Sequence, residues 1–224
     1  MIFGILTAVI FALVSAAVFT EKSKNDLRIK KILTRIHKPL GYLFIVLIVV
    51  HLSLNLLLIR QRSIIIYIIG TAMLLCAVAA IIVKRILTDQ RKALICHKLC
   101  ALAIALLLIT HVAFCVVGLD NYQQEIADIS FSEIAISDIA DGTYTGECDV
   151  NYIYAKVKVT VSGGVLTNID LIEHRNERGK AGEGVIDKML LEQHTDVDAV
   201  SGATNSSKVI KKAVENALEN ATKQ

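Results

Sequence analysis

The chain has 224 residues, of which 54% are hydrophobic and 20% charged, with a mean hydropathy of +0.56, one Pro and no Trp. This composition excludes a wholly soluble globule, and the near absence of Pro excludes a collagen-like or disordered chain. The net charge of +3 hides an uneven distribution. Residues 1–118 carry 14 Lys and Arg against 3 Asp and Glu, whereas residues 119–224 carry 10 against 18. Such a division indicates two bodies in different surroundings, one of them in lipid.

The first half of the chain is organised around long apolar runs. A helix needs about 20 apolar residues to cross the hydrocarbon core of a bilayer. Four runs meet that length, and they predict transmembrane helices over about residues 2–20, 41–59, 64–83 and 99–118. We therefore expect an all-α four-helix membrane bundle over residues 1–118. Pro39 predicts that the second helix begins near that residue, because proline disfavours helical geometry in the residue before it.

The loops between these helices indicate their orientation. Seven basic residues lie within 22–38 and five within 84–98, whereas the first charged residues after Gly118 are all acidic. By the positive-inside rule, the two basic loops are cytoplasmic and everything after Gly118 lies outside. The chain is thus predicted to be a multi-pass protein of the cell membrane, a bacterial membrane being expected. In an alternative interpretation, residues 1–17 are a cleaved signal peptide, although they lack a basic start, and cleavage would invert the topology.

Four histidines in the membrane half share one spacing. His37 and His51 are 14 residues apart, and so are His97 and His111. Fourteen residues are close to four helical turns, so the members of each pair lie on one face, about 21 Å apart along the axis. The second and fourth helices run in the same direction. His37 is therefore expected at the depth of His97, near the inner side, and His51 at the depth of His111, near the outer side.

This arrangement predicts a site for two haem groups. Histidine is costly in hydrocarbon and is usually retained there for a function. Two imidazoles from facing helices can fill both axial positions of a haem iron. The pattern resembles the transmembrane cytochrome b domains of ferric-reductase and NADPH-oxidase type proteins, and the resemblance implies two b-type haems, an inner one on His37 and His97 and an outer one on His51 and His111. The alternative is that each His only makes a hydrogen bond between helices.

The second half predicts a small α+β domain over residues 141–224, joined to the membrane half by residues 119–140, a linker or short helix. Residues 153–161 alternate between apolar and polar and predict a strand with one buried face. Gly163-Gly164 predicts a hairpin turn into a strand over 165–173, and helices follow over 185–193 and through an apolar face near the end of the chain. His174 and His194 are expected at the surface. Cys148 has no partner within this domain for a disulfide.

A glycine-containing turn, Asp198-Ala199-Val200-Ser201-Gly202-Ala203-Thr204, enters the last helix. Thr204, Asn205 or Ser206 could be its N-cap. A phosphate esterified to Thr204 would lie at the positive end of that helix.

The turn resembles the flavinylation motif of the FMN-binding domain family, Asp-x-x-Ser/Thr-Gly-Ala-Thr, found in flavin subunits of the sodium-pumping NADH:quinone oxidoreductase and the Rnf complex. The resemblance implies that Thr204 carries FMN through a phosphodiester installed by a flavin transferase. It also implies that Asp198, Ser201, Gly202 and Ala203 are recognition residues. The loop over residues 177–183 lacks the Pro that family members often have there, so its flavin contacts stay unassigned.

Together these features predict a transmembrane electron-transfer protein with two haems in the bilayer and a covalently bound FMN outside. A quinol or a membrane dehydrogenase is the expected donor, and the acceptor is expected outside the membrane; nucleic acid is not an expected partner. Whether the chain is itself an enzyme or one component of an oxidoreductase stays open. Two alternatives are a haem-free anchor that presents a flavin domain within a larger respiratory complex, and a reductase whose flavin acts directly on a small substrate or a metal.

Overall fold

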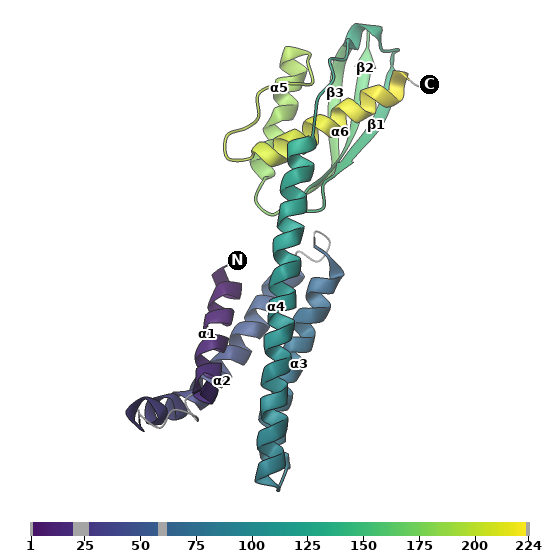
Figure 1. The fold of residues 1–224 in the computed structure, drawn as a ribbon. Helices are drawn as coiled ribbons and strands as arrows, with labels where there is room; N and C mark the ends of the chain where they lie inside the picture. The colour runs from purple at the N-terminus through teal and green to yellow at the C-terminus, as the bar shows by residue number, and fades with distance from the viewer. Residues whose placement is uncertain (1, 20–26, 58–61, 223–224) are drawn as a thin grey trace. The chain divides into compact units, whose positions relative to one another are not determined.

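The computed structural model describes residues 2–19, 27–57 and 62–222 (Figure 1). The chain divides into two compact units, which we call the helical unit (Met1–Ile59 and Ser63–Val116) and the sheet unit (Arg60–Arg62 and Val117–Gln224). Each is described by itself.

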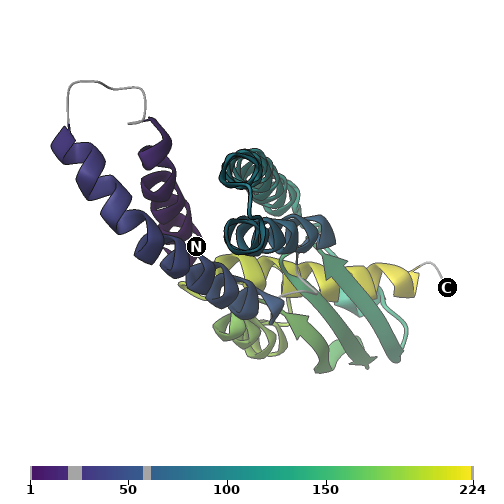
Figure 2. The ribbon, with the colours of Figure 1, turned by 90° about the horizontal axis from the view of Figure 1, so that it is seen from below.

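Four helices supply the helical unit, and the last of them continues into the sheet unit. Their bounds are Ile2–Phe19 for α1, Leu27–Leu56 for α2, Ile64–Ile86 for α3 and Gln90–Asp128 for α4. Within the helical unit, α1 lies beside α2 and α3 beside α4, as the view from below shows (Figure 2). The apolar runs in the sequence thus form helices, as expected.

Three of these helices are long and apolar enough to cross a membrane, counting only the described residues. The spans are Lys31–Leu56, Ile64–Ile86 and Gln90–Asp128, whereas α1 contributes a shorter apolar stretch, Phe3–Ala16. Residue 20 and residues 58 and 59, at the ends of two predicted helices, lie outside the described part of the chain. The structure is therefore compatible with membrane insertion by at least three spans.

The prediction that the second helix begins at Pro39 is wrong. Helix α2 runs through Pro39 without a break, and its first turns lie at an angle to the rest (Figure 1). Proline removes one backbone hydrogen bond and bends a helix. The residues on either side of Pro39 keep helical geometry, so the helix continues at the cost of one backbone hydrogen bond. His37 consequently lies inside the helix.

The helical unit has a narrow core where its four helices meet. The rings of Phe11 and Phe44 pack at 5.3 Å between centroids. The other buried members of this cluster are Ile10, Leu47, Ile48, Ala77 and Ile104. Most other apolar side chains of these helices are exposed, as expected for surfaces that face lipid.

The sheet unit contains one antiparallel sheet of three strands in the order β1-β2-β3. The strands are β1 over Gly142–Asp149, β2 over Tyr154–Ser162 and β3 over Val165–Arg175. Gly163 and Gly164 both have positive φ angles, 61° and 75°, which is what a tight hairpin between β2 and β3 requires. The two strands predicted over 153–161 and 165–173 and the hairpin between them are confirmed, and β1 adds a third strand to the sheet.

Helices cover one face of this sheet. The short helices are η3 (Ile136–Asp138), η4 (Lys180–Gly184) and α5 (Val185–Glu192), and the long one is α6 (Thr204–Thr222), which crosses the sheet (Figure 1). The predicted apolar face of α6 is completely buried: Val209, Ile210, Ala213, Val214, Ala217 and Leu218 all have no exposed surface. Packing of α6 on the alternating residues of β2 forms the core of the sheet unit.

Residues 119–140, predicted as a linker or a short helix, begin as the last turns of α4, which ends only at Asp128. Tyr122 and Ile126 lie one turn apart and are buried in the core of the sheet unit, together with Ile136 and Ile139 further along. Most acidic residues of the segment are exposed, whereas its apolar residues pack in the core of the sheet unit.

Candidate cofactor sites

The first candidate site is the turn that precedes α6. Gly202 has a φ of +78°, a conformation that favours glycine, and a Cβ added there would meet no atom within 4 Å. Ala203 is 5% exposed, so it leaves no room for a larger side chain. Thr204, by contrast, is exposed and is the first residue of α6. The turn thus presents the Thr204 hydroxyl at the start of a helix, where backbone N–H groups lack partners within the helix.

The other hydroxyls near this turn are less accessible. Ser206 and Ser207 are buried, at 1% and 0% exposure. The Ser207 hydroxyl donates to the carbonyl oxygen of Ala203 and accepts from the N–H of Val200, which fixes the turn on the helix. Ser201 is exposed, as is Asp198, whose carbonyl oxygen accepts from the ammonium group of Lys188 at 2.9 Å. Thr204 and Ser201 are therefore the exposed hydroxyls of this turn.

His174 lies against this turn rather than at the surface, which corrects the sequence-based expectation. Its side chain is only 3% exposed. Nδ1 lies 2.9 Å from a carboxylate oxygen of Glu183, and Nε2 lies 3.2 Å from the hydroxyl of Ser206. The end of β3, helix η4 and the start of α6 are thus connected through one imidazole. His194 is exposed, as expected.

Two further features of this region were missed at the level of sequence. A Cβ at Gly179 would lie 1.9 Å from the Ser206 hydroxyl, and a Cβ at Gly182 would lie 2.8 Å from Ser206 Cβ. The two glycines therefore allow the charged loop to pack on the first turn of α6. The side-chain amide of Asn205 also donates to the Tyr122 hydroxyl at 2.8 Å. Of these features, only the two glycines, spaced three residues apart, could have been noticed in the sequence.

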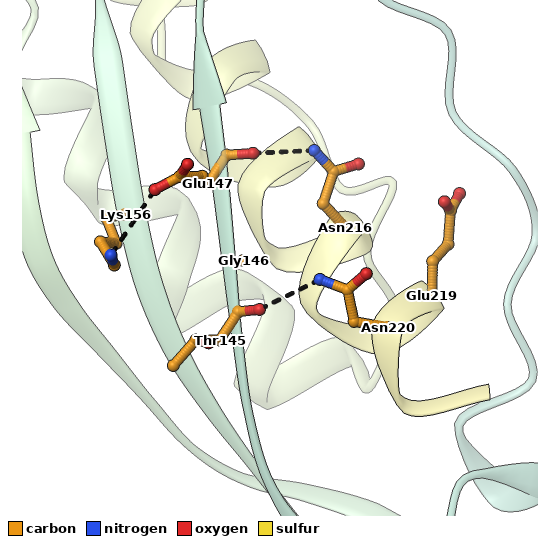
Figure 3. Close-up of a pocket in the computed structure, with 7 residues that line it drawn as sticks. All are labelled: Thr145, Gly146, Glu147, Lys156, Asn216, Glu219 and Asn220. Atoms are coloured by element: carbon orange, nitrogen blue, oxygen red, sulfur yellow. Dashed lines mark hydrogen bonds and ion pairs between the residues drawn. The ribbon is translucent and has the colours of Figure 1, made fainter. Parts of the chain in front are cut away.

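An open, polar pocket lies elsewhere on the sheet unit, over β1 and the second half of α6 (Figure 3). Asn216 and Asn220 donate to the backbone oxygens of Glu147 and Thr145, so they satisfy the outer edge of β1. At about 1.5 Å per helical residue, Asn216 is roughly 18 Å along α6 from Thr204. The pocket is therefore separate from the turn that carries Thr204.

The second candidate site is formed by the four histidines of the helical unit. The imidazoles of His37 and His97 lie 5.9 Å apart between ring centroids, at an interplanar angle of 70°. Those of His51 and His111 lie 6.4 Å apart, at 72°. Each pair joins α2 to α4, so the structure brings together the same residues that the equal spacings placed at one depth.

Hydrogen bonds orient the inner pair. Nδ1 of His37 donates to the carbonyl oxygen of Val14 in α1 at 3.1 Å, and Nδ1 of His97 donates to that of Ala80 in α3 at 2.9 Å. A carbonyl can only accept, so Nδ1 of both rings carries a proton, and in a neutral ring of this tautomer the lone pair is on Nε2.

The outer pair is held differently. The side-chain amide of Asn55 lies 3.4 Å from Nδ1 of His51, and Nδ1 of His111 is buried with no hydrogen-bond partner among the described residues. No group of three or more His, Cys, Asp or Glu side chains in the described ranges could hold a metal ion. All five cysteines, which are within the described residues, are free thiols.

The sheet unit is a small α+β domain in which an exposed threonine begins a helix, two residues after a glycine with a positive φ angle. In agreement, residues 153–219 match the family of FMN-binding domains. This part of the chain is an FMN-binding domain.

The chain is also similar to an uncharacterized protein of Treponema pallidum (strain Nichols), with 28% identity over 195 residues. The match covers 80% of this chain and 52% of that protein, so the chain spans about half the length of the curated relative it matches. No solved structure matches the chain.

Proposed function

We propose that this protein is a membrane electron-transfer flavoprotein that holds two b-type haems between α2 and α4 and carries FMN on Thr204. Bound haem exchanges single electrons, and bound FMN exchanges one or two. The FMN-binding domain supports a flavin-based electron-transfer role. The observation that carries the haem part is the pairing of four intramembrane histidines into two facing levels, 5.9 and 6.4 Å between ring centroids.

The ring separations fit axial ligation. Two imidazoles on one iron have centroids about 6 Å apart, because each iron–nitrogen bond is about 2 Å and each centroid lies about 1 Å beyond its nitrogen. His37 and His97 would hold the inner haem, and His51 and His111 the outer one. At the inner level, the bonds from Nδ1 to Val14 and Ala80 leave Nε2 of both rings for the iron, as metal-bound histidines usually require.

Exposure supports Thr204 as the residue that carries FMN. A phosphodiester needs a hydroxyl that a flavin transferase can reach, and Thr204 is exposed while Ser206 and Ser207 are buried. The phosphate would lie at the N-terminal end of α6, where the helix dipole favours negative charge. Asp198, Ser201, Gly202 and Ala203 would form the turn that the transferase recognises.

The charge distribution supports the topology. We place the basic loops in the cytoplasm and the FMN-binding domain outside, with α1 as a fourth membrane span. A quinol or a membrane dehydrogenase would be the donor, and the acceptor would meet the flavin outside the membrane.

The test uses the full chain, produced in a haem-replete bacterial host with a flavin transferase and purified in detergent. We expect an intact mass increased by one FMN less one water, and a haem spectrum of two b-type haems per chain. A protein with flavin but no Soret band would favour the haem-free anchor. A chain without covalent flavin would overturn the assignment of Thr204. Reduction of a small acceptor without any partner protein would favour the direct reductase.

A further inference from the structure

Helices α1 and α3 each contact both histidines of the helix that follows them. At the inner level the contact is a hydrogen bond, from His37 to the carbonyl of Val14 and from His97 to that of Ala80. The two bonds differ by only 0.2 Å in length, at 3.1 and 2.9 Å. Both orient the imidazole in the same way, with Nε2 free to ligate.

At the outer level the contact is with a glycine. A Cβ built on Gly4 of α1 would lie 3.1 Å from Cε1 of His51, and 3.7 and 3.8 Å from its two ring nitrogens. A Cβ built on Gly70 of α3 would lie 4.0 Å from Cε1 of His111. At Gly4 the lack of a side chain allows a tight approach of α1 to the His51 ring, whereas at Gly70 a Cβ would reach the His111 ring at an ordinary contact distance. The approach is closer at Gly4.

These four positions repeat at one spacing. Ten residues separate Gly4 from Val14, and ten separate Gly70 from Ala80. The histidines on the partner helices are 14 residues apart in both cases. The repeat extends to the core between the levels, where Phe44 lies midway between His37 and His51, and Ile104 lies midway between His97 and His111; both are buried.

The same correspondence holds for the first helices. Phe11 lies seven residues after Gly4, and Ala77 lies seven residues after Gly70. Both are buried in the core of the helical unit. Figure 2 shows α1 beside α2 and α3 beside α4, although the backbones of α1 and α2 approach each other more closely than those of α3 and α4.

We propose that the helical unit consists of two copies of one haem-clamping hairpin, α1–α2 and α3–α4. In each copy the second helix supplies one ligand to each haem. The first helix supplies a carbonyl that fixes the tautomer of the inner ligand, and a glycine that positions the outer ligand. This inference rests on the proposed haem sites and assigns Gly4 and Gly70 as positioning residues of the outer haem.

The two kinds of contact have different physical effects. The carbonyl bond holds the imidazole as the Nδ1–H tautomer, which makes Nε2 a ligand. The glycine determines how far the outer ring is pushed toward the opposite helix. A side chain at that position would displace the ring and with it the ligating nitrogen. Changing a hydrogen-bond partner that orients a metal ligand typically lowers metal affinity by about 10- to 100-fold.

The test compares three glycines in the purified full chain: Gly4, Gly70 and, as the control, Gly41. A Cβ at Gly41 of α2 would meet no atom within 4 Å. Each is replaced by Ala and by Leu, and haem content per chain and the reduced spectrum are measured. The outer haem is identified as the one that His111→Ala removes. Because Ala favours a helix more than Gly does, by about 1 kcal/mol, a loss of haem cannot come from helix propensity.

We expect Gly4→Leu and Gly70→Leu to lose the outer haem and keep the inner one, while Gly41→Leu keeps both. Gly4→Ala should weaken or shift the outer haem, since its Cβ would be 3.1 Å from the ring, whereas Gly70→Ala, with 4.0 Å, should keep it. A wild-type chain with two haems whose Gly4 and Gly70 variants match the Gly41 variants would overturn this inference alone. A wild-type chain that binds no haem would overturn the proposed function and this inference with it.

Discussion

The helical unit and the sheet unit differ in how far their apolar side chains are buried. In α4 many apolar side chains are exposed, among them Leu102 at 56% and Ile109 at 68%. In the sheet unit, Val157 of β2 and Val214 of α6 have no exposed surface at all. Lipid would replace protein contacts around the first unit, whereas the second must exclude water by packing.

This difference decides where a functional residue stands out. In the apolar helices of the helical unit, a histidine is easily recognised in the sequence. The equal spacing of the two histidine pairs is then enough to predict that His51 lies at the depth of His111. In the sheet unit polar residues are common, and Thr204 is exposed whereas Ser206, two residues later, is buried against His174. Its importance follows from the backbone turn at Gly202 and from a family resemblance. We therefore expect that each of the two proposed sites can be removed without the other.

The largest effect is expected from Thr204→Ala. If Thr204 carries the phosphodiester, covalent flavin should disappear completely although Ser201 is also exposed, while both haems remain. The measurement is flavin fluorescence on a denaturing gel beside the haem spectrum of the same preparation. Thr167→Ala changes an exposed threonine of β3, far along the chain from the turn, and serves as the control. Fluorescence that survives in Thr204→Ala would show that another residue carries the flavin.

The next effect is the loss of one haem of two in His111→Ala. The variant removes one of the two imidazoles proposed for the outer haem, whose centroids lie 6.4 Å apart, and leaves the inner pair and Thr204 intact. Haem content per chain should fall by about half, with covalent flavin unchanged. His194→Ala, which removes an exposed histidine of the sheet unit, should change neither. Unchanged haem content in His111→Ala would contradict the proposal that histidines of α2 and α4 bind haem in pairs.

Much of the fold could be predicted from the sequence because the patterns that carry it are local. The alternation in β2, the Gly163-Gly164 hairpin and the buried face of α6 all arise within a few residues. The path of α2 through Pro39 could not be predicted in the same way. The local preference of proline disfavours a helix there, and the helix nevertheless continues at the cost of one backbone hydrogen bond.

The sites divide along the same line. The spacing of the four histidines is a property of single helices, so sequence could anticipate which would meet. The contact of His174 with Ser206 joins residues 32 positions apart, and it exists because glycines at 179 and 182 let a loop approach α6. Nothing local distinguishes such a histidine from an exposed one. Residues 119–140 are a similar case. Their many acidic residues indicate a linker, but Tyr122 and Ile126 among them pack in the core of the sheet unit.

A smaller effect, confined to the sheet unit, is expected from Gly146→Ala. A Cβ there would lie 2.2 Å from the carbonyl oxygen of Ala213 and 2.3 Å from the nitrogen of Ala217, both backbone atoms of α6. Strand and helix must move apart, at a cost of at least about 2 kcal/mol in the free energy of unfolding. Amide hydrogen exchange should become faster in β1 and β2, while the haem spectrum stays the same. Gly184→Ala is the matched control, because its Cβ would meet Val200 at an ordinary 3.6 Å.

The smallest effect concerns Cys148, whose pKa burial raises from 9.0 to about 11. The folded unit therefore keeps this thiol protonated where the unfolded chain would release the proton. The resulting stability is fully present below pH 9 and is lost as pH rises from 9 toward 11. Since only the thiolate is alkylated, the rate of alkylation at Cys148, followed on its peptide by mass spectrometry, should keep rising about tenfold per pH unit between pH 8 and 10. A rate that levels off above pH 9 would mean an ordinary thiol and a looser contact between β1 and α6. That contact belongs to the sheet unit alone, so the haem spectrum recorded over the same pH range should not follow the alkylation curve.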